Sequence, residues 1–393
     1  MIQRLIDNNQ IEIFLQPIVS LKNNKIFAFE ALTRAHDENN EFISPIELFQ
    51  EARNEKLSNL LDNYVRELAL KKFVNYYQDN KDLMIFLNFE STFIDSQELN
   101  NFLETVQKYE INPSNIVLEI KEDEIRDNNA ITKFVEFYRS HGFIIAIDDF
   151  GTGYSSFDRL SLIKPDIVKI DRSLIYNVDT NFVNSEILRA VANMCHKIGA
   201  IVLAEGVESE EEILNCMKKD IDVFQGFYFS KAQESIGAYV NDTIYSSIKK
   251  IGTSYKKSIN SLIENKKIIL EESKDLSNTI AQALQAKEHI NKLQHIISSN
   301  TNLEAIYLID FLTGLQQENT IIDIEESALF KSTQDGHDHS LKEYFFVAKS
   351  SSRNDYLSAT YVSKASGHIC RTYSSIITIK NIKYVLCLDI ITN

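Results

Sequence analysis

One short apolar run after another in this sequence ends in a polar side chain, and this pattern constrains the fold more than any other feature. The runs are rich in Ile, Val and Phe, which is typical of buried β-strands. The polar residues that end these runs or lie within them are Glu30, Asn88, Glu119, Asp148, Asp149, Lys169, Glu205 and Gln225. Because an α/β barrel brings the carboxyl ends of its strands to one mouth, we expect these side chains to converge there. Carboxylates, an amide and a lysine at one mouth indicate a site for divalent metal ions bound through oxygen.

The alternation of strands and helices along the first part of the chain indicates an α/β barrel. Strands are predicted at residues 12–20, 26–34, 83–90, 116–122, 143–149, 167–171, 201–205 and 223–229. Helical spacing fills most of the intervals, and strands that alternate with helices favour a parallel sheet. The number and spacing of the strands fit a TIM (β/α)8 barrel. Only LKNNK joins the first two strands, which is too short for a helix, so this modified barrel is expected to contain one antiparallel strand.

The composition excludes some classes of partner. The net charge is −15 and no long run of Lys or Arg occurs, so a nucleic acid polymer is not expected as a partner. A small anionic substrate is compatible with this charge if bound metal ions supply local positive charge. The four cysteines form no CxxC pair, and no apolar run approaches the ~20 residues of a membrane helix. Together with an N-terminus that lacks a signal-peptide pattern, these features predict a cytoplasmic protein without a membrane span.

The chain changes character after residue 240. Residues 241–300 contain no proline, and apolar residues recur every seven positions at Leu262, Ile269, Leu276, Ala283, Ile290 and Ile297. One heptad seam is compatible with a helix packed on its own domain or with a helix that forms a homodimer. Residues 301–393 then contain several strand-like runs and one short helical piece. The expected organisation is a barrel at 1–240, a helical connector at 241–300 and a small α+β domain at 301–393.

The segment DDFGTGYSS at 148–156 carries the most specific chemical signal. Two adjacent carboxylates at a strand end can bind two metal ions, which together hold the attacking and leaving oxygens of a phosphoryl displacement. Helix capping is the alternative role for such aspartates, and the acidic residues at other strand ends make it less favoured. Lys169 needs a carboxylate partner in its apolar strand, and Glu205 can accept a proton or orient a water. A structural ion pair for Lys169 and a capping amide for Gln225 stay open as alternatives.

Five motifs together resemble those of EAL domains, the bacterial phosphodiesterases that open cyclic di-GMP. They are EALTR at 30–34, DDFGTGYSS at 148–156, KPDIVKID at 164–171, AEGVE at 204–208 and QGFYFS at 225–230. The resemblance runs in order from about Phe14 to Ser230, well over half of the chain. It implies hydrolysis of cyclic di-GMP to linear pGpG at a two-metal site that holds Mg²⁺ or Mn²⁺.

The resemblance also assigns roles to the residues at matching positions. The implied metal ligands are Glu30, Asn88, Glu119 and Asp148 for one ion. Asp148 and Asp149 are the implied ligands of the second ion, with Glu205 nearby, directly or through water. The implied catalytic residues are Lys169, which would contact the attacking water, together with Glu205, Gln225 and Glu122. The implied substrate-binding residues are Gln16, Leu32 and Arg34, of which Arg34 would hold a phosphate with its guanidinium group.

Lys121 departs from the pattern of the family. In LEIKE at 118–122 it stands where EAL domains usually carry Thr or Ser. A cation at this position would pair with Glu122 or reduce the affinity for metal. The alternative function is therefore a catalytically weak or inactive EAL-type receptor for cyclic di-GMP.

The C-terminal region is similar in pattern to PAS-like or Cache-like sensor domains. Its strand-like runs are EAIYLID, YLSATYVS, SSIITI and KYVLCLDI. The similarity implies a regulatory domain that binds a small molecule of unknown identity. The residues at 337–339, HDH, form a candidate metal cluster, for which a solvated loop is the alternative.

Overall fold

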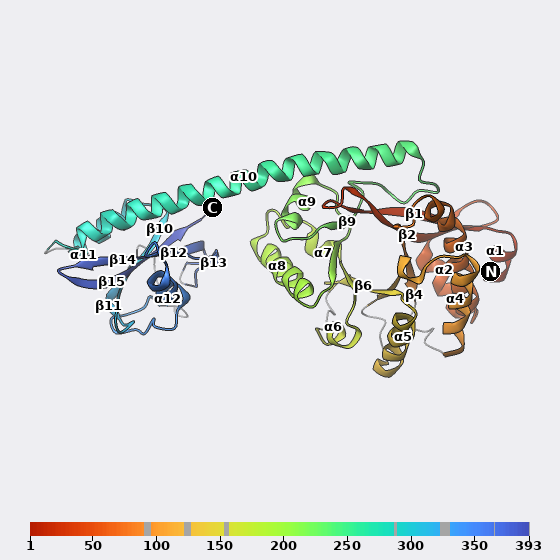
Figure 1. Ribbon diagram of the computed structural model, residues 1–393, viewed down its shortest axis with the longest axis horizontal. Coiled ribbons are helices and arrows are strands. Elements are labelled where there is room, and N and C mark those ends of the chain that lie inside the picture. The colour runs from red at the N-terminus through yellow and green to blue at the C-terminus, as the bar shows by residue number, and fades with distance from the viewer. Residues whose placement is uncertain are drawn as a thin grey trace. The chain divides into compact units, whose positions relative to one another are not determined.

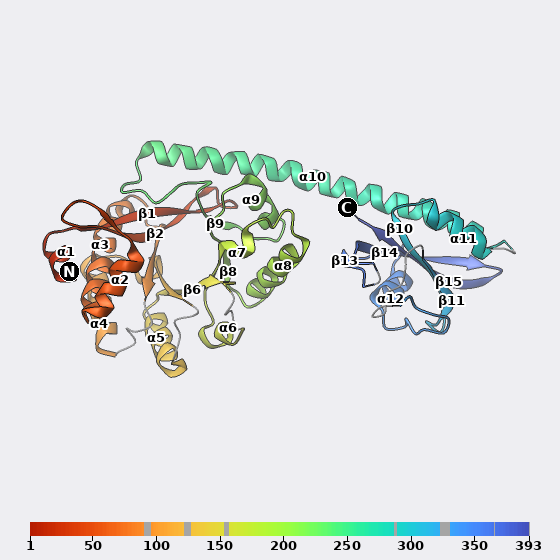
Figure 2. The same cartoon turned by 180° about the vertical axis from the view of Figure 1, so that it is seen from behind.

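The computed structural model describes residues 1–89, 96–121, 127–152, 157–286, 289–322, 331–364 and 366–392. The chain divides into two units, Met1–Ser258 and Ile259–Asn393, and each is described by itself. Figures 1 and 2 show the elements of both units from opposite sides. Among the helices of the described ranges, none has both the length and the apolar character needed to cross a bilayer.

The first unit is a closed barrel with helices around it. Its strands are β1 (Ile11–Ser20), β2 (Lys25–His36), β3 (Phe42–Ile43), β4 (Met84–Phe89), β5 (Ile116–Lys121), β6 (Ile144–Phe150), β7 (Ile167–Ile170), β8 (Ile201–Ala204) and β9 (Val223–Gln225). Its helices are α1 (Ile2–Asp7), α2 (Pro45–Asn54), α3 (Ser58–Asp79), α4 (Ser96–Lys108), the 3₁₀ turn η2 (Pro113–Asn115), α5 (Asn128–Ser140), α6 (Phe157–Ile163), α7 (Arg172–Ile175), α8 (Phe182–Lys197) and α9 (Glu210–Met217).

The strand order confirms the modified TIM barrel. Strands follow one another as β1-β9-β8-β7-β6-β5-β4-β2, β1 also pairs with β2 to close the sheet, and the short β3 lies beside β2. β1 runs antiparallel to both of its neighbours, β2 and β9. The other barrel pairs, β2–β4, β4–β5, β5–β6, β6–β7, β7–β8 and β8–β9, are parallel. The single antiparallel barrel strand expected from the short LKNNK connection is therefore present.

A ring of apolar side chains fills the barrel interior, with one residue from each barrel strand. Its members are Ile18, Ala28, Phe86, Val117, Ala146, Ile167, Leu203 and Val223. Since side chains on one face of a strand recur every second residue, the next inward position of each strand lies two residues further on. The ring thus forms an apolar floor, and the following layer faces the mouth of the barrel.

The second unit is an antiparallel sheet with helices on both faces. Its strands are β10 (Leu303–Asp310), β11 (Gln316–Ile322), β12 (Asp355–Leu357), β13 (Tyr361–Val362), β14 (Ile369–Ile379) and β15 (Ile382–Ile391), in the order β11-β10-β15-β14-β12 with β13 beside β14. One face packs on α11 (His289–Ser298) and on the end of α10 (Ala238–Ala283), and the other packs on α12 (Glu343–Ser350). The boundaries at 240 and 300 and the similarity to sensor domains stay predictions.

β9 ends at Gln225, earlier than the predicted end at residue 229, because the chain turns sharply at Gly226. The backbone N–H of Val207 donates to the Gln225 carbonyl at 3.1 Å, and the Tyr228 N–H donates to the Val207 carbonyl at 3.1 Å. A Cβ atom on Gly226 would lie 2.1 Å from the Val207 carbonyl oxygen. Only glycine allows this approach, which fixes the position of Gln225 at the barrel mouth.

Gly226→Ala is predicted to destabilise the protein by about 1–3 kcal/mol, because the added methyl group forces backbone atoms apart. Gly237→Ala is the matched control, since a Cβ atom there meets nothing within 4 Å. Thermal unfolding should show a lower Tm for the first variant and little change for the second. Equal Tm values for the two variants would contradict the close approach.

Candidate metal centre

The layer above the apolar floor is polar on every barrel strand. Two residues beyond the ring positions of the parallel strands lie Glu30, Asn88, Glu119, Asp148, Lys169, Glu205 and Gln225. On the antiparallel β1 the equivalent position is two residues earlier, at Gln16, which pairs in register with Glu30. The alternation that buries the apolar ring therefore also brings these predicted site residues to one mouth.

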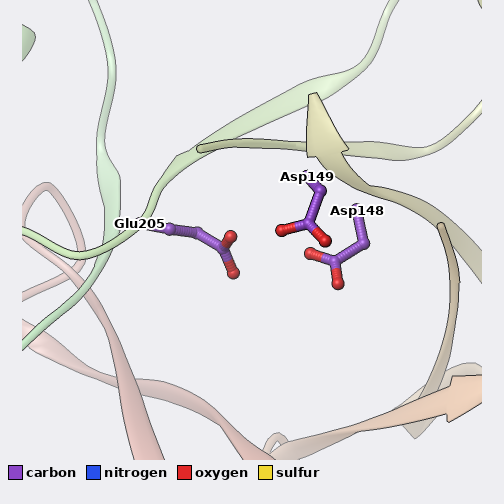
Figure 3. Close-up of side chains that lie close together, drawn as sticks. All are labelled: Asp148, Asp149 and Glu205. Carbon is purple, nitrogen blue, oxygen red and sulfur yellow. The ribbon is translucent and has the colours of Figure 1, made fainter. Parts of the chain in front are cut away.

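Asp148 and Asp149 both reach this mouth because β6 is bulged. Consecutive residues of a regular strand point to opposite faces. Against β7, however, the register shifts by one residue between Ile147 and Phe150, and Asp149 adopts a positive φ of 57°. A bulge of this kind re-aims the extra side chain. The carboxylates of Asp148, Asp149 and Glu205 consequently offer oxygen atoms that lie within 4.8 Å of one another (Figure 3).

Lys169 is the positive centre of this acidic site. Its side chain is 1% exposed, and its Nζ lies 2.7 Å from Glu205 Oε1, 3.0 Å from Asp148 Oδ1 and 3.7 Å from Glu30 Oε1. Nζ also contacts Glu119 Oε1. Burial alone would lower the pKa of this lysine, but the surrounding carboxylates outweigh burial and hold the Lys169 pKa well above its ordinary value. The side chain is therefore an ammonium ion across the neutral range.

Glu30 accepts hydrogen bonds from amide side chains of two other strands. Gln225 Nε2 donates to Glu30 Oε2 and, at 3.1 Å, to Gln16 Oε1. Asn88 Nδ2 donates to Glu30 Oε1 at 3.3 Å. Gln16 Nε2 donates in turn to the carbonyl oxygen of Ser230 at 3.2 Å. Side chains of β4 and β9 thus orient the Glu30 carboxylate on β2, and Gln16 of β1 supports Gln225.

Burial raises the pKa of three carboxyl groups in the site. Desolvation raises the pKa of Glu205 to about 8, and the charge of Asp148 adds to the rise against the opposing Lys169. Desolvation also raises the pKa of Glu119 well above its ordinary value, although Lys169 opposes the rise. For Asp149, burial and then the charge of Asp148 raise the pKa. The carboxyl groups therefore resist ionising together unless more positive charge is brought in.

The donor set fits divalent metal ions. The carboxylates of Glu30, Glu119, Asp148, Asp149 and Glu205 surround a single buried ammonium group. In the described part of the chain, the buried Glu119 Oε2 has no hydrogen-bond partner. Leaving a buried carboxylate oxygen without a partner is costly, and a cation with oxygen ligands would satisfy it.

A cleft of about 510 Å³ opens above the polar layer, a volume typical of small-molecule sites. Leu32 and Arg34 line it beside Glu30, because these three residues alternate along one face of β2. Arg34 Nη1 donates to the carbonyl of Thr33 at 2.8 Å, and partial burial lowers the pKa of Arg34. The cleft therefore offers the guanidinium group of Arg34 to an anionic ligand above the carboxylates.

Lys121 lies at the rim of the same cleft. It follows Glu119 by two residues on β5, so it projects to the same face one step nearer the mouth. Its Nζ lies 3.6 Å from Asp149 Oδ2, and both side chains are more than a third exposed. Such a pair is weak, but it places a second cation beside a carboxylate that the sequence predicts as a metal ligand.

The structure gathers nearly all of the predicted site residues in this mouth and cleft. Glu30, Asn88, Glu119, Asp148, Asp149, Lys169, Glu205, Gln225 and Gln16 form the polar layer, and Leu32 and Arg34 line the cleft. The predicted loop residue Glu122 lies outside the described residues. The sequence did not predict that Ile46, Phe49 and Arg53 of α2 line the cleft wall. The Ser44 capping box observed in the structure begins this helix but carries no signal for a site.

These features define a barrel with an acidic cluster at its strand ends whose donors fit divalent metal ions. Comparison with known proteins gives its family. Residues 1–232 match the EAL domain, and the chain belongs to that family. It is 30% identical over 232 residues to the probable cyclic di-GMP phosphodiesterase PdeB of Escherichia coli K12. That alignment covers 59% of this chain but only 44% of PdeB, so the chain spans less than half of this relative.

Solved structures show the same fold. Bacillus subtilis YkuI, an EAL-domain protein solved with its substrate c-di-GMP and calcium, matches with a TM-score of 0.80 and 22% identity, covering 100% of this chain and 99% of YkuI. Klebsiella pneumoniae BlrP1, solved with manganese and cyclic di-GMP, matches with a TM-score of 0.53 and 27% identity, covering 58% of this chain and 57% of BlrP1. Both of these neighbours hold the cyclic dinucleotide and a divalent metal ion.

The metal-free protein is predicted to lose stability as pH rises. Folded Glu205 keeps its proton up to a pKa of about 8, whereas an unfolded glutamic acid loses it near a pKa of about 4.3. Between these values the folded state binds more protons than the unfolded state, so rising pH favours unfolding. In EDTA the Tm should fall across this window, and Glu205→Gln should reduce the fall. A Tm that rises with pH, or an equal fall in the variant, would be inconsistent with a buried protonated Glu205.

Lys121→Gln is predicted to tighten Mn²⁺ binding by about two- to tenfold, because it removes a partly exposed positive charge beside Asp149. Lys133→Gln removes the same charge from the exposed surface of α5 and should leave the affinity unchanged. Titration calorimetry with Mn²⁺ measures both variants. Unchanged or weaker binding in Lys121→Gln would show that Lys121 does not oppose the metal.

Proposed function

We propose that this chain hydrolyses cyclic di-GMP to linear pGpG with Mg²⁺ or Mn²⁺ at the barrel mouth. The observation that carries the proposal is the position of Asp148 and Asp149. The bulge in β6 directs both carboxylates toward a mouth that buried carboxylates already line. Paired carboxylates that can bind two ions suit phosphodiester hydrolysis. Membership of the EAL family and the dinucleotide bound by the structural neighbours support the choice of substrate.

The metal ligands in this proposal come from four strands. Glu30, Asn88, Glu119 and Asp148 would hold one ion, and Asp148 and Asp149 would hold the other. When bound, such ions neutralise the phosphate and lower the pKa of a water molecule. Gln225 would act on the site through its hydrogen bond to Glu30.

Lys169 and Glu205 have different tasks at the attacking water. Lys169 is held as an ammonium ion, so it orients the water oxygen by donating an N–H and does not take its proton. Glu205 lies 2.7 Å from that ammonium group. Bound metal ions would favour its ionised form, and the carboxylate would then accept the proton that the water releases as it attacks phosphorus. The 3′ oxygen then leaves from the side opposite the water. A loop-bracing role for Glu122 stays a prediction.

The cleft residues would position the dinucleotide. Arg34 donates to a phosphate oxygen, which suits its planar guanidinium group, and Leu32 provides apolar contact beside it. Gln16 is 9% exposed and bonds to Gln225 and Ser230, so in this conformation its amide group supports Gln225. Its predicted contact with substrate would require the amide to exchange these partners.

We further propose that the chain is a homodimer whose C-terminal unit regulates the barrel. The support for dimerisation is the exposure of Leu262, Ile263 and Ile268 on α10, which are 39%, 50% and 47% exposed. Only part of the heptad seam is buried within the second unit, where Leu276 and Ala283 pack against the sheet core.

The hydrolysis is tested by incubating the full chain with cyclic di-GMP and Mn²⁺ or Mg²⁺ and separating the nucleotides. Product pGpG is expected, and Ca²⁺ should inhibit because its looser geometry does not fix both reacting oxygens. Glu30→Gln should slow turnover by about 100-fold or more, because it removes charge from a metal ligand. Glu136→Gln, an exposed carboxylate on α5, is the control and should keep the wild-type rate.

The alternative function is a receptor that binds the dinucleotide without cleaving it, and the Lys121 contact with Asp149 is the observation that favours it. Saturable binding of cyclic di-GMP without product in either metal would establish the receptor and overturn the hydrolase.

A further inference from the structure

The C-terminal unit contains a cavity that the proposed phosphodiesterase does not use. Its volume is about 490 Å³, within the range of small-molecule sites. β10, β14 and β15 supply Tyr307, Thr372 and Asp389 to its lining, and α12 supplies Tyr344. Side chains of the apolar cluster beneath α12, among them Ala305, border the same space.

A carboxylate lines this cavity on a sheet face that is covered by a helix, a position that is usually apolar. Asp389 of β15 pairs in register with Thr372 of β14. Thr372 Oγ1 donates to Asp389 Oδ1 at 2.7 Å, Tyr307 OH donates to the same oxygen at 3.4 Å, and Tyr361 OH lies 3.0 Å from Thr372 Oγ1. These hydroxyl groups fix the orientation of the carboxylate but bring no positive charge.

A bulge brings a second carboxylate to the same cavity. The register of β10 against β15 shifts between Leu303 and Ala305, so Glu304 is the extra residue. Glu304 is 4% exposed and accepts hydrogen bonds from the hydroxyl groups of Ser363 and Ser366 and from Cys370 Sγ, and the exposed His368 places Nδ1 3.5 Å from its Oε2. Bulges commonly re-aim a side chain toward a functional site. Here the bulge adds negative charge to the lining that already holds Asp389.

The aromatic walls are neutral. His339 is 2% exposed, its Nε2 lies 2.9 Å from Gln316 Oε1 and its Nδ1 lies 2.7 Å from Tyr344 OH. Burial lowers the pKa of His339 to about 4, so the neutral ring donates from Nε2 and accepts at Nδ1. Both ring nitrogens are therefore engaged, which leaves neither for the metal cluster considered at 337–339. The Tyr307 ring stacks on His339 with centroids 5.6 Å apart.

The two carboxylates affect one another. Burial raises the pKa of Asp389 to about 6, and the charge of Glu304 adds to the rise against the hydrogen bonds from Thr372 and Tyr361. The lysines of the lining, Lys331 and Lys364, are exposed and belong to its mouth. Negative charge thus lies within the cavity and aromatic rings lie beside it, an arrangement that favours an organic cation.

We propose that this cavity binds a small molecule through a protonated amine, which Asp389 and Glu304 hold beside the tyrosine rings. An ammonium group offers three donors to the carboxylate oxygens and replaces the water that they lose on burial. Aromatic faces attract the same cation. The amine belongs either to a simple alkylamine or to an amino acid, whose own carboxylate would meet the lysines at the mouth.

The proposal is tested by titration calorimetry of the full chain with propylamine and with alanine as separate probes. Propanol and propionate, which lack the amine, are the control ligands. Asp389→Asn and Glu304→Gln each remove one charge and keep an oxygen acceptor, and each should raise Kd by about tenfold or more. Asp335→Asn, an exposed aspartate of the same unit, should bind like the wild type.

Each outcome decides the proposal. Saturable binding of either amine that is weakened in Asp389→Asn or Glu304→Gln and kept in Asp335→Asn supports it, and the preferred probe identifies the source of the amine. If one cavity variant does not fold, which circular dichroism reports, the other carries the test. Absence of binding by both amines, equal binding of propanol or propionate, or unchanged affinity in the folded cavity variants overturns it.

Discussion

The site depends on the interaction of one buried lysine with carboxylates from different barrel strands. Lys169 lies against Glu30, Glu119, Asp148 and Glu205, which come from β2, β5, β6 and the end of β8. Breaking a buried ion pair by removing one partner costs about 3–5 kcal/mol, because it leaves an unbalanced charge. The lysine therefore keeps the acidic mouth compatible with a folded barrel, while the remaining negative charge is left for a divalent metal ion.

The apolar ring below the polar layer keeps water away from the buried side of the site. One side chain per strand closes the barrel interior, so the polar layer has dry protein beneath it and the cleft above it. Interactions between charges strengthen where water is excluded. That environment raises the pKa of Glu205 and Glu119, and it makes the mouth a strong attractor for cations.

Much of this arrangement could be predicted from the sequence, because period-two alternation is local. It places Glu30, Asn88 and Glu119 two residues after buried positions, and the parallel order of the strands then brings them together. The bulge at Asp149 could not be predicted, since it depends on the register between β6 and β7 and on a positive φ. The hydrogen bonds of Gln225 likewise depend on the close approach of Gly226 to another segment.

The strands of the C-terminal unit are also hard to predict from sequence, because several of them depend on pairing with distant segments. β11 is mostly polar and exposed, so its sequence lacks the alternation of apolar and polar residues that indicates a strand. Its pairing with β10 also shifts register, which the sequence does not reveal. The single strand expected at YLSATYVS is instead divided into β12 and β13, which pair separately with β14. These edge strands are defined by their partner and not by their own pattern.

Anomalous diffraction from crystals grown with Mn²⁺ would locate the metal ions at the barrel mouth directly. Two manganese peaks are expected about 4 Å apart, both in contact with Asp148, with Glu30 and Glu119 on one ion and Asp149 on the other. A map without manganese there, or with a single ion that Asp149 does not touch, would contradict the two-metal site.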